Sequence, residues 1–270
     1  MTQKMTHTEN KQKNVEKMHV LKVGGNELHK EGFLPGLARL LAQSPHGTVV
    51  VHGGGKAIAS LQKRLGIHPK KVDGLRVTDA PSLEVAQMVL CGKANKEIVT
   101  ALLASGIDAV GLSGIDAGLI TCRKKSHPGG DLGFVGEVVE VRADLLRRLA
   151  QNGLTPVISP ISLGEDGQVY NVNADEAACA VASSLKADLL DFVSNVPGVK
   201  DGETVYDALT EPQTQQLITE GVIRGGMIPK VSAALQAVGN GVATARIINL
   251  EGLGTGAGTS FGVALERSEA

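Results

Sequence analysis

The chain has 270 residues, a net charge of −1 from 27 basic and 28 acidic side chains, and 34 Gly, roughly twice the usual share of glycine. Four Phe and two Tyr are its aromatic residues, so the core must be aliphatic, and binding of single-stranded nucleic acid by base stacking is disfavoured. Plentiful aliphatic residues at near-zero net charge argue against disorder, and no apolar run approaches the roughly 20 residues of a membrane span.

The first 17 residues are polar, and we expect them to form a disordered arm. They contain no apolar stretch typical of a secretory signal. The three cysteines, Cys91, Cys122 and Cys179, lie far apart and show no metal-ligand spacing. These features predict a cytoplasmic protein without a structural metal site.

Short strands alternate with amphipathic helical stretches along the rest of the chain. Several strands are apolar at nearly every position, which is typical of strands buried on both faces of a parallel sheet. The pattern predicts an α/β fold with helices on both faces of a mainly parallel sheet. In chain order we expect strands His19–Val23 and Thr48–His52, helices Lys56–Leu65 and Ser82–Ser105, strand Ala109–Leu112, helix Ala143–Asn152, strand Pro156–Ser159, helix Asp175–Leu185, strand Leu189–Val193, helices Pro212–Glu220 and Ile228–Val238, and strand Ala245–Ile248.

Two other segments are expected to form antiparallel hairpins. One pairs Leu119–Arg123 with Gly136–Val141, and the other flanks the turn Gly164–Gly167. The helix Ser82–Ser105 is unusually long and carries small residues at positions 92 and 94, near its middle. Two interpretations of this helix stay open: a long core helix, or a helix that crosses its mate in a dimer.

Two glycine clusters directly follow expected strands: Gly24-Gly25 and Gly53–Gly55. Neither fits the P-loop or the dinucleotide-binding fingerprint. Backbone N–H groups at such a turn, beside a helix N-terminus and without side chains in the way, can still bind a phosphate. The sequence therefore predicts an anion site at the carboxyl ends of these strands, where open α/β sheets bind ligands.

Three charged residues stand near these glycines in the expected fold. Lys22 sits in an otherwise aliphatic stretch, so it lies either at a solvated edge or, beside the glycines, against a ligand. Lys230 falls in the first turn of a helix, where a cation is unfavourable unless a polyphosphate binds there. Asp175 is either a helix N-cap or a carboxylate that holds the two lysines.

Two further groups suit a substrate. Asn171 and Asn173 lie on one face of an extended segment because side chains alternate along a strand. Arg76 is a candidate clamp for a substrate carboxylate through bidentate pairing.

Six motifs in this order resemble the amino-acid kinase family, and within it the enzymes that phosphorylate N-acetyl-L-glutamate. Each motif is short, but six in the same order are specific, and the resemblance runs from about residue 18 to 263. They are Lys22–Gly25 (KVGG), Val51–Gly55 (VHGGG), Gly74–Thr78 (GLRVT), Gly133–Glu137 (GFVGE), Tyr170–Asp175 (YNVNAD) and Gly225–Val231 (GGMIPKV).

The resemblance implies a three-layer αβα sandwich. Residues 18–175 would form an N-terminal lobe for the acyl amino acid and for dimerisation, and residues 176–270 a C-terminal lobe for ATP. It also implies a homodimer built on the helix Ser82–Ser105. Because the first 17 residues lack the amphipathic helix of arginine-inhibited hexameric members, we expect no hexamer.

Residue roles are implied as well. The lysines would stabilise the phosphoryl group in transfer, Asp175 would orient them, and glycine N–H groups would bind phosphate oxygens. Mg²⁺ would be held mainly through the phosphates of ATP, and Asn195 stands where an acidic residue is common in the family. The implied catalytic residues are Lys22, Lys230, Asp175, Gly25 and Gly54; the acyl amino acid would contact Gly54, Gly55, Arg76, Asn171 and Asn173; and ATP would contact Lys22, Gly24, Ser194, Asn195, Gly198, Met227 and Lys230.

The implied activity is ATP-dependent phosphorylation of the side-chain carboxylate of N-acetyl-L-glutamate, the second step of arginine biosynthesis. No general base is needed, because a carboxylate is already deprotonated at neutral pH. Two alternatives stay open. One is the same transfer to a carrier-protein-linked aminoadipate or glutamate, and the other is a nucleotide-binding sensor without catalysis.

Overall fold

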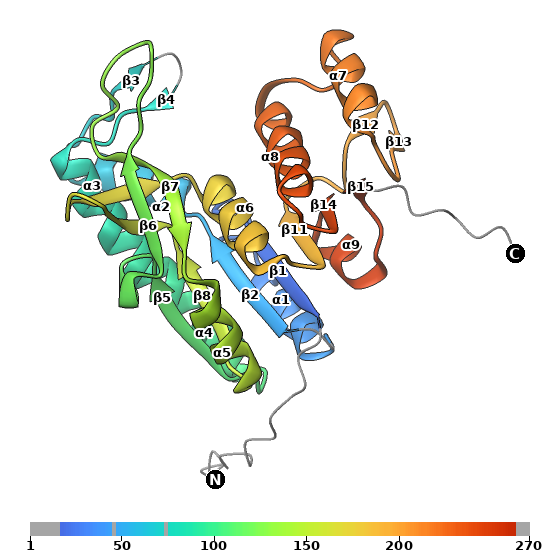
Figure 1. The fold of residues 1–270 in the computed structure, drawn as a ribbon, viewed down its shortest axis with the longest axis horizontal. Helices are drawn as coiled ribbons and strands as arrows, with labels where there is room; N and C mark the ends of the chain where they lie inside the picture. Colours follow the sequence, from blue (N-terminus) through green and yellow to red (C-terminus); the bar gives the residue numbers. More distant parts are fainter. Residues whose placement is uncertain (1–16, 45–46, 73–74, 263–270) are drawn as a thin grey trace, which may run out of the picture.

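The computed structural model describes residues 17–44, 47–72 and 75–262. Within that part of the chain, a central sheet of seven strands runs through the molecule, parallel except for one edge strand (Figure 1). The mainly parallel sheet predicted from the apolar strands is confirmed. In spatial order the strands are β15 (Thr259–Gly262), β14 (Thr244–Ile248), β11 (Leu189–Val193), β1 (Met18–Val23), β2 (Gly47–His52), β8 (Thr155–Ser159) and β5 (Ala109–Ser113).

Helices cover both faces of the sheet, which confirms the three-layer αβα architecture. Residues of β1 alternate between the two faces: Leu21 and Val23 pack into one core, and Val20 packs into the other. One face is covered by α1 (Phe33–Ala42), α4 (Asn95–Ala104) and α9 (Leu250–Thr255), and the other by α5 (Ala143–Gln151), α6 (Ala174–Leu185) and α8 (Ile228–Gly239).

The expected long helix is present, but its middle is not a regular α-helix. It consists of α3 (Ala80–Gln87), a π-helical segment (Met88–Ala94) and α4, without a break between them. The extra residue per turn of a π-helix rotates the buried face of the segments around it, and such segments gather at functional sites. Of the two small residues near the middle, Ala94 is buried in the core and Gly92 is exposed.

Both expected hairpins are confirmed. The strands β6 (Ile120–Lys124) and β7 (Val135–Val141) pair antiparallel, as do β9 (Ile161–Gly164) and β10 (Val169–Val172). Parallel pairing of β10 with β7 and of β6 with β9 then closes the four strands into a small barrel, which the sequence did not indicate. Its last strand leads directly into α6.

The remaining elements flank the two ends of the sheet. Figure 1 shows the short hairpin of β3 and β4 at one side of the molecule and α7 at the other. No helix in the described part of the chain is long and apolar enough to cross a membrane. The expected disordered arm, apart from Lys17, lies outside the described residues. The bounds are α2 (Gly55–Arg64), β3 (Lys71–Val72), β4 (Leu75–Arg76), β12 (Lys200–Asp201), β13 (Thr204–Val205) and α7 (Glu211–Thr219).

Candidate active site

Lys22 is the next-to-last residue of β1, which lies in the middle of the sheet between β11 and β2. The residue is 6% exposed, so the solvated-edge interpretation of this lysine is excluded. Burying an ammonium group is costly unless an opposite charge faces it. Lys22 therefore needs a carboxylate close by.

Asp175 supplies that carboxylate. Lys22 Nζ lies 2.8 Å from Asp175 Oδ1. This oxygen accepts no hydrogen bond from the described residues, so the contact is an ion pair whose geometry is not that of a hydrogen bond. The N-cap of α6 is Asn173, whose side-chain oxygen accepts the backbone N–H of Asp175 at 2.8 Å. Asp175 thus lies in the first turn of α6, and its carboxylate is not used for capping.

Lys230, the third residue of α8, faces the same space. Burial lowers the pKa of Lys230, repulsion from Lys22 lowers it further, and the carboxylates of Asp175 and Glu27 oppose both effects. Two cations are therefore close enough to repel each other around one shared carboxylate. Such an arrangement is unfavourable by itself and suits a polyanionic ligand.

The two glycine loops meet backbone to backbone. A Cβ atom on Gly25 would lie 2.6 Å from the backbone nitrogen of Gly54, and one on Gly54 would lie 2.7 Å from Leu90 Cδ2 in the π-helical segment. Gly25 has no room for a side chain, because the atoms in the way are backbone, and a side chain on Gly54 would have to displace that of Leu90. The absence of side chains therefore lets the turns after β1 and β2 come together, with their N–H groups near the lysines.

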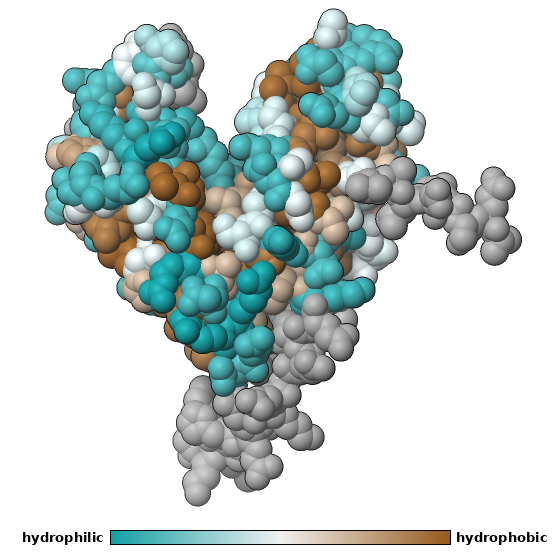
Figure 2. Space-filling model, in the orientation of Figure 1, coloured by the Kyte–Doolittle hydropathy of each residue, from teal (hydrophilic) through white to brown (hydrophobic). Residues whose placement is uncertain are grey.

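A cavity of about 430 Å³ opens beside these groups. Figure 2 shows the molecule hollowed between the part that carries β3 and β4 and the part that carries α7 and α8. The apolar side chains in the wall are aliphatic, as expected for a chain so poor in aromatic residues. The wall consists of Lys22, Gly24, Gly25, Asn26, Glu27, Gly55, Ser194, Asn195, Val196, Gly226, Met227 and Lys230.

Most residues predicted to contact ATP are in this wall, but Gly198 is not. It lies after β11 against Thr259 and Val205, where a Cβ atom would collide with both. Gly198 therefore supports the loop that carries Ser194 and Asn195 rather than lining the cavity.

The residues predicted to bind the acyl amino acid are placed only in part. Asn171 Nδ2 donates to Thr78 Oγ1 at 3.4 Å, so the YNVNAD and GLRVT motifs lie side by side. The backbone of Arg76 belongs to β4, while its side chain lies outside what the structure describes. Asn173 uses its oxygen to cap α6, which leaves its amide N–H groups for other contacts.

His52, directly before the second glycine cluster, has a structural role. Its Nε2 lies 3.2 Å from Asn95 Nδ2, and its Nδ1 lies 3.1 Å from the carbonyl oxygen of Gly53. Because an amide nitrogen can only donate, Nε2 must accept and Nδ1 must carry the proton. Burial lowers the pKa of His52 to about 4, so the ring is neutral at pH 7 and ties α4 to the glycine loop.

One buried residue of the wall, Glu27, is not among the predicted site residues. Glu27 is 4% exposed and lines the cavity two residues after Gly25. A carboxylate next to a predicted phosphate loop is unexpected, because it repels phosphate. This unusual position, two residues after Gly24-Gly25, was the signal available in the sequence.

The glycine loops and two converging lysines face one cavity at the carboxyl ends of a mainly parallel sheet covered by helices. This arrangement is typical of α/β proteins that bind phosphate groups. The chain belongs to the amino acid kinase family, whose model matches residues 17–249. The resemblance inferred from the six motifs is thereby confirmed.

Curated relatives and solved structures agree with this membership. The chain is 53% identical over 234 residues to an acetylglutamate kinase of Roseiflexus sp. (strain RS-1), covering 87% of this chain and 89% of the relative. It is 44% identical over 250 residues to that of Methanopyrus kandleri, covering 90% and 99%. The crystal structure of smu.665 from Streptococcus mutans UA159 has a TM-score of 0.79 at 28% identity, covering 92% and 99%.

Proposed function

We propose that this protein transfers the γ-phosphoryl group of ATP to the side-chain carboxylate of N-acetyl-L-glutamate, forming an acyl phosphate in the second step of arginine biosynthesis. The observation that carries the proposal is the convergence of Lys22, Lys230 and Asp175 beside the glycine loops. Relatives at 44 to 53% identity that are named acetylglutamate kinases support the substrate.

The chemistry follows from the charges. Phosphorylating a carboxylate brings two anions together, so the protein must align them and neutralise the charge on the moving phosphoryl group. Lys22 and Lys230 approach it with their ammonium groups, and Asp175 fixes the position of both. Backbone N–H groups of Gly25 and Gly54 bind its oxygens, and no residue has to remove a proton.

The two substrates would occupy the two halves of the hollow. ATP would lie on the C-terminal lobe, residues 176–270, against Ser194, Asn195 and Met227, and it would also contact Gly24 of the other lobe; all four residues line the cavity. The acyl amino acid would lie on the N-terminal lobe, residues 18–175. There we assign it Gly54, Gly55, Arg76, Asn171 and Asn173.

Mg²⁺ would come with ATP and reduce the charge of its phosphates. Among the described residues there is no cluster of three or more side chains that could hold a metal ion alone. The phosphates would therefore supply most of the metal's ligands. The buried carboxylate in the wall is that of Glu27. The three cysteines are unpaired, which fits a reducing compartment such as the cytoplasm.

A product assay tests this function. Incubation with ATP, Mg²⁺ and free N-acetyl-L-glutamate should give an acyl phosphate, which hydroxylamine traps as a hydroxamate. Product from a carrier-linked aminoadipate or glutamate alone would indicate the alternative acceptor. ATP binding without product from any acyl amino acid would indicate a sensor.

We also propose a homodimer through the long helix. Met88 and Leu103, on the helical run 80–104, are 51% and 45% exposed, and β5 is an edge strand within the described sheet. Exposed apolar side chains beside an open edge favour an interface. Sizing chromatography should show two subunits, and Leu103→Asp should shift the protein toward one. A mass of about six subunits would contradict the dimer.

A further inference from the structure

The carboxylate of Glu27 is held inside the cavity wall by the chain around it. A turn after β1, in which Glu27 N–H donates to the carbonyl oxygen of Gly24 at 3.2 Å, directs the side chain back over that glycine. Glu27 Oε2 lies so close to Gly24 that a Cβ atom there would overlap it. Gly24 thus leaves space for a carboxylate as well as for a ligand.

This carboxylate has few partners. Its side chain is 6% exposed, and its one ion pair among the described residues is with Lys30, at 3.8 Å. Lys30 is itself about half exposed, so solvent weakens the pair. A buried carboxylate normally accepts short hydrogen bonds or coordinates a metal.

The surrounding charges make this position more unusual. On the same wall, Lys22 already pairs with Asp175, and Lys230 feels both Asp175 and Glu27. Glu27 also faces the space where the phosphates of a nucleotide would lie. An anion there weakens nucleotide binding unless a cation stands between the two.

We propose that Glu27 is the protein's own ligand for the divalent cation that accompanies the nucleotide, either directly or through a water molecule. The donor fits, because Mg²⁺ prefers carboxylate oxygens, keeps several waters and typically takes one or two carboxylates together with phosphates. The lack of a larger acidic cluster among the described residues fits as well, since the site would be complete only when a nucleotide is bound. This inference rests on the proposed function.

A competing explanation assigns Glu27 only to the position of Lys230. The two explanations differ in how nucleotide affinity depends on metal. If Glu27 only positions Lys230, removing its charge changes the affinity in the same direction with and without Mg²⁺. If Glu27 binds the cation, the two affinities move in opposite directions, because without metal the carboxylate merely repels the phosphates.

Calorimetric titration of ADP into the full chain, once in MgCl₂ and once in EDTA, separates these cases. Glu27→Gln should weaken binding of the Mg²⁺ complex by about tenfold. The same variant should bind metal-free ADP more tightly than the unchanged protein. Glu31→Gln is the matched control, since Glu31 is exposed, outside the cavity wall and four residues further on, and it should leave both affinities nearly unchanged.

The outcomes are distinct. A change of both dissociation constants in the same direction, or no change in either, would overturn the inference. If the unchanged protein bound no ADP in either buffer, the proposed function itself would fail. Should Glu27→Gln unfold, Glu27→Asp keeps the charge on a shorter side chain. It should weaken only the Mg²⁺ complex, and equal weakening in EDTA would overturn the inference.

Discussion

Replacing Lys230 by Met should lower kcat by about a thousandfold or more, because transition-state charge on the phosphoryl group would lose one of its two cations. Met keeps most of the aliphatic stem, so the packing of the first turn of α8 is retained. Removing Lys230 also relieves its repulsion with Lys22. We therefore expect an unchanged or slightly higher melting temperature together with the loss of activity.

Initial rates of N-acetyl-L-glutamate phosphorylation at saturating ATP measure this loss. Lys56→Met is the matched control: Lys56 also lies in the first turn of a helix, directly after Gly55, but it is exposed and outside the cavity wall. Its kcat should remain within about twofold of the unchanged protein, since surface substitutions away from the site have small effects. Near-normal turnover of Lys230→Met would show that this lysine does not stabilise the transferred group.

The sequence predicts the elements of this fold well where local pattern and tertiary packing agree. The strands of the sheet centre are apolar on both faces and were found within about two residues. Helix α1 was not predicted, because Pro35 and Gly36 interrupt its pattern and Gly32 gives it no side-chain cap. Gly36 packs closely against α9, since a Cβ atom there would lie 2.8 Å from Leu250 Cδ2.

The sequence predicts those residues of the site that are unusual in their local context. Lys22 and Lys230 stood out because a lysine in an apolar strand or at a helix start is unusual without an anion. The acid near them, Glu27, went unnoticed, because only the turn at Gly24 shows that its side chain is buried. The π-helical turn and the closing of the barrel depend on long-range contacts that no local pattern encodes.

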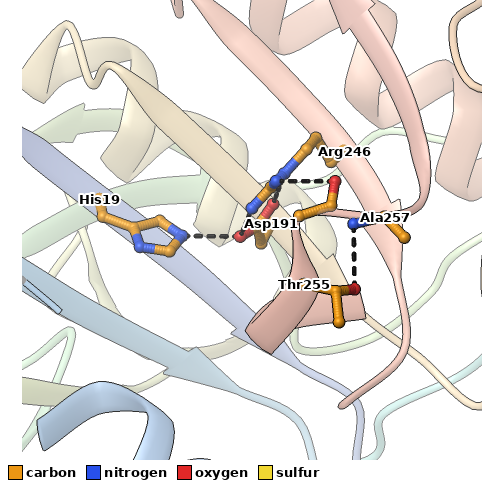
Figure 3. Close-up of polar contacts among 6 residues, drawn as sticks. His19, Asp191, Arg246, Thr255 and Ala257 are labelled. Atoms are coloured by element: carbon orange, nitrogen blue, oxygen red, sulfur yellow. Dashed lines mark hydrogen bonds and ion pairs between the residues drawn. The ribbon is translucent and has the colours of Figure 1, made fainter. Parts of the chain in front are cut away.

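A largely buried charge network between three strands of the sheet is likewise not predicted by the local sequence pattern. His19, Asp191 and Arg246 come from three neighbouring strands, β1, β11 and β14, and meet on one face of the sheet (Figure 3). Arg246 Nε and Nη2 each lie 2.7 Å from an oxygen of Asp191, and His19 Nε2 lies 2.8 Å from Asp191 Oδ2. Each residue lies in a mostly apolar strand, and only the register of the strands brings the three together.

Asp191 is the centre of this network, and its removal should be the most destabilising single change considered. Burial would raise the pKa of Asp191, but the hydrogen bonds from His19 and Arg246 outweigh burial and lower it. The carboxylate is therefore ionised in the folded protein and contributes stability above the ordinary pKa of an aspartate. That contribution is lost as the pH falls through the lowered pKa.

Asp191→Ala should lower the free energy of unfolding by about 3–5 kcal/mol, because it leaves Arg246, whose side chain is only 15% exposed, without its counter-charge. Urea unfolding at pH 7 measures this difference. Asp144→Ala is the control, since Asp144 also pairs with an arginine, Arg148, but both side chains are about 60% exposed. Its cost should stay below about 1 kcal/mol.

Removing both charges at once separates the two contributions of the network. In Asp191→Leu/Arg246→Met no cation is left unpaired beside β11, so the double variant should regain much of the stability that Asp191→Ala loses. If the loss instead equals that of Asp191→Ala, packing of the aspartate rather than its charge holds the strands together. β11 leads into Ser194 and β1 carries Lys22, so the strands that this network joins also carry two residues of the cavity wall.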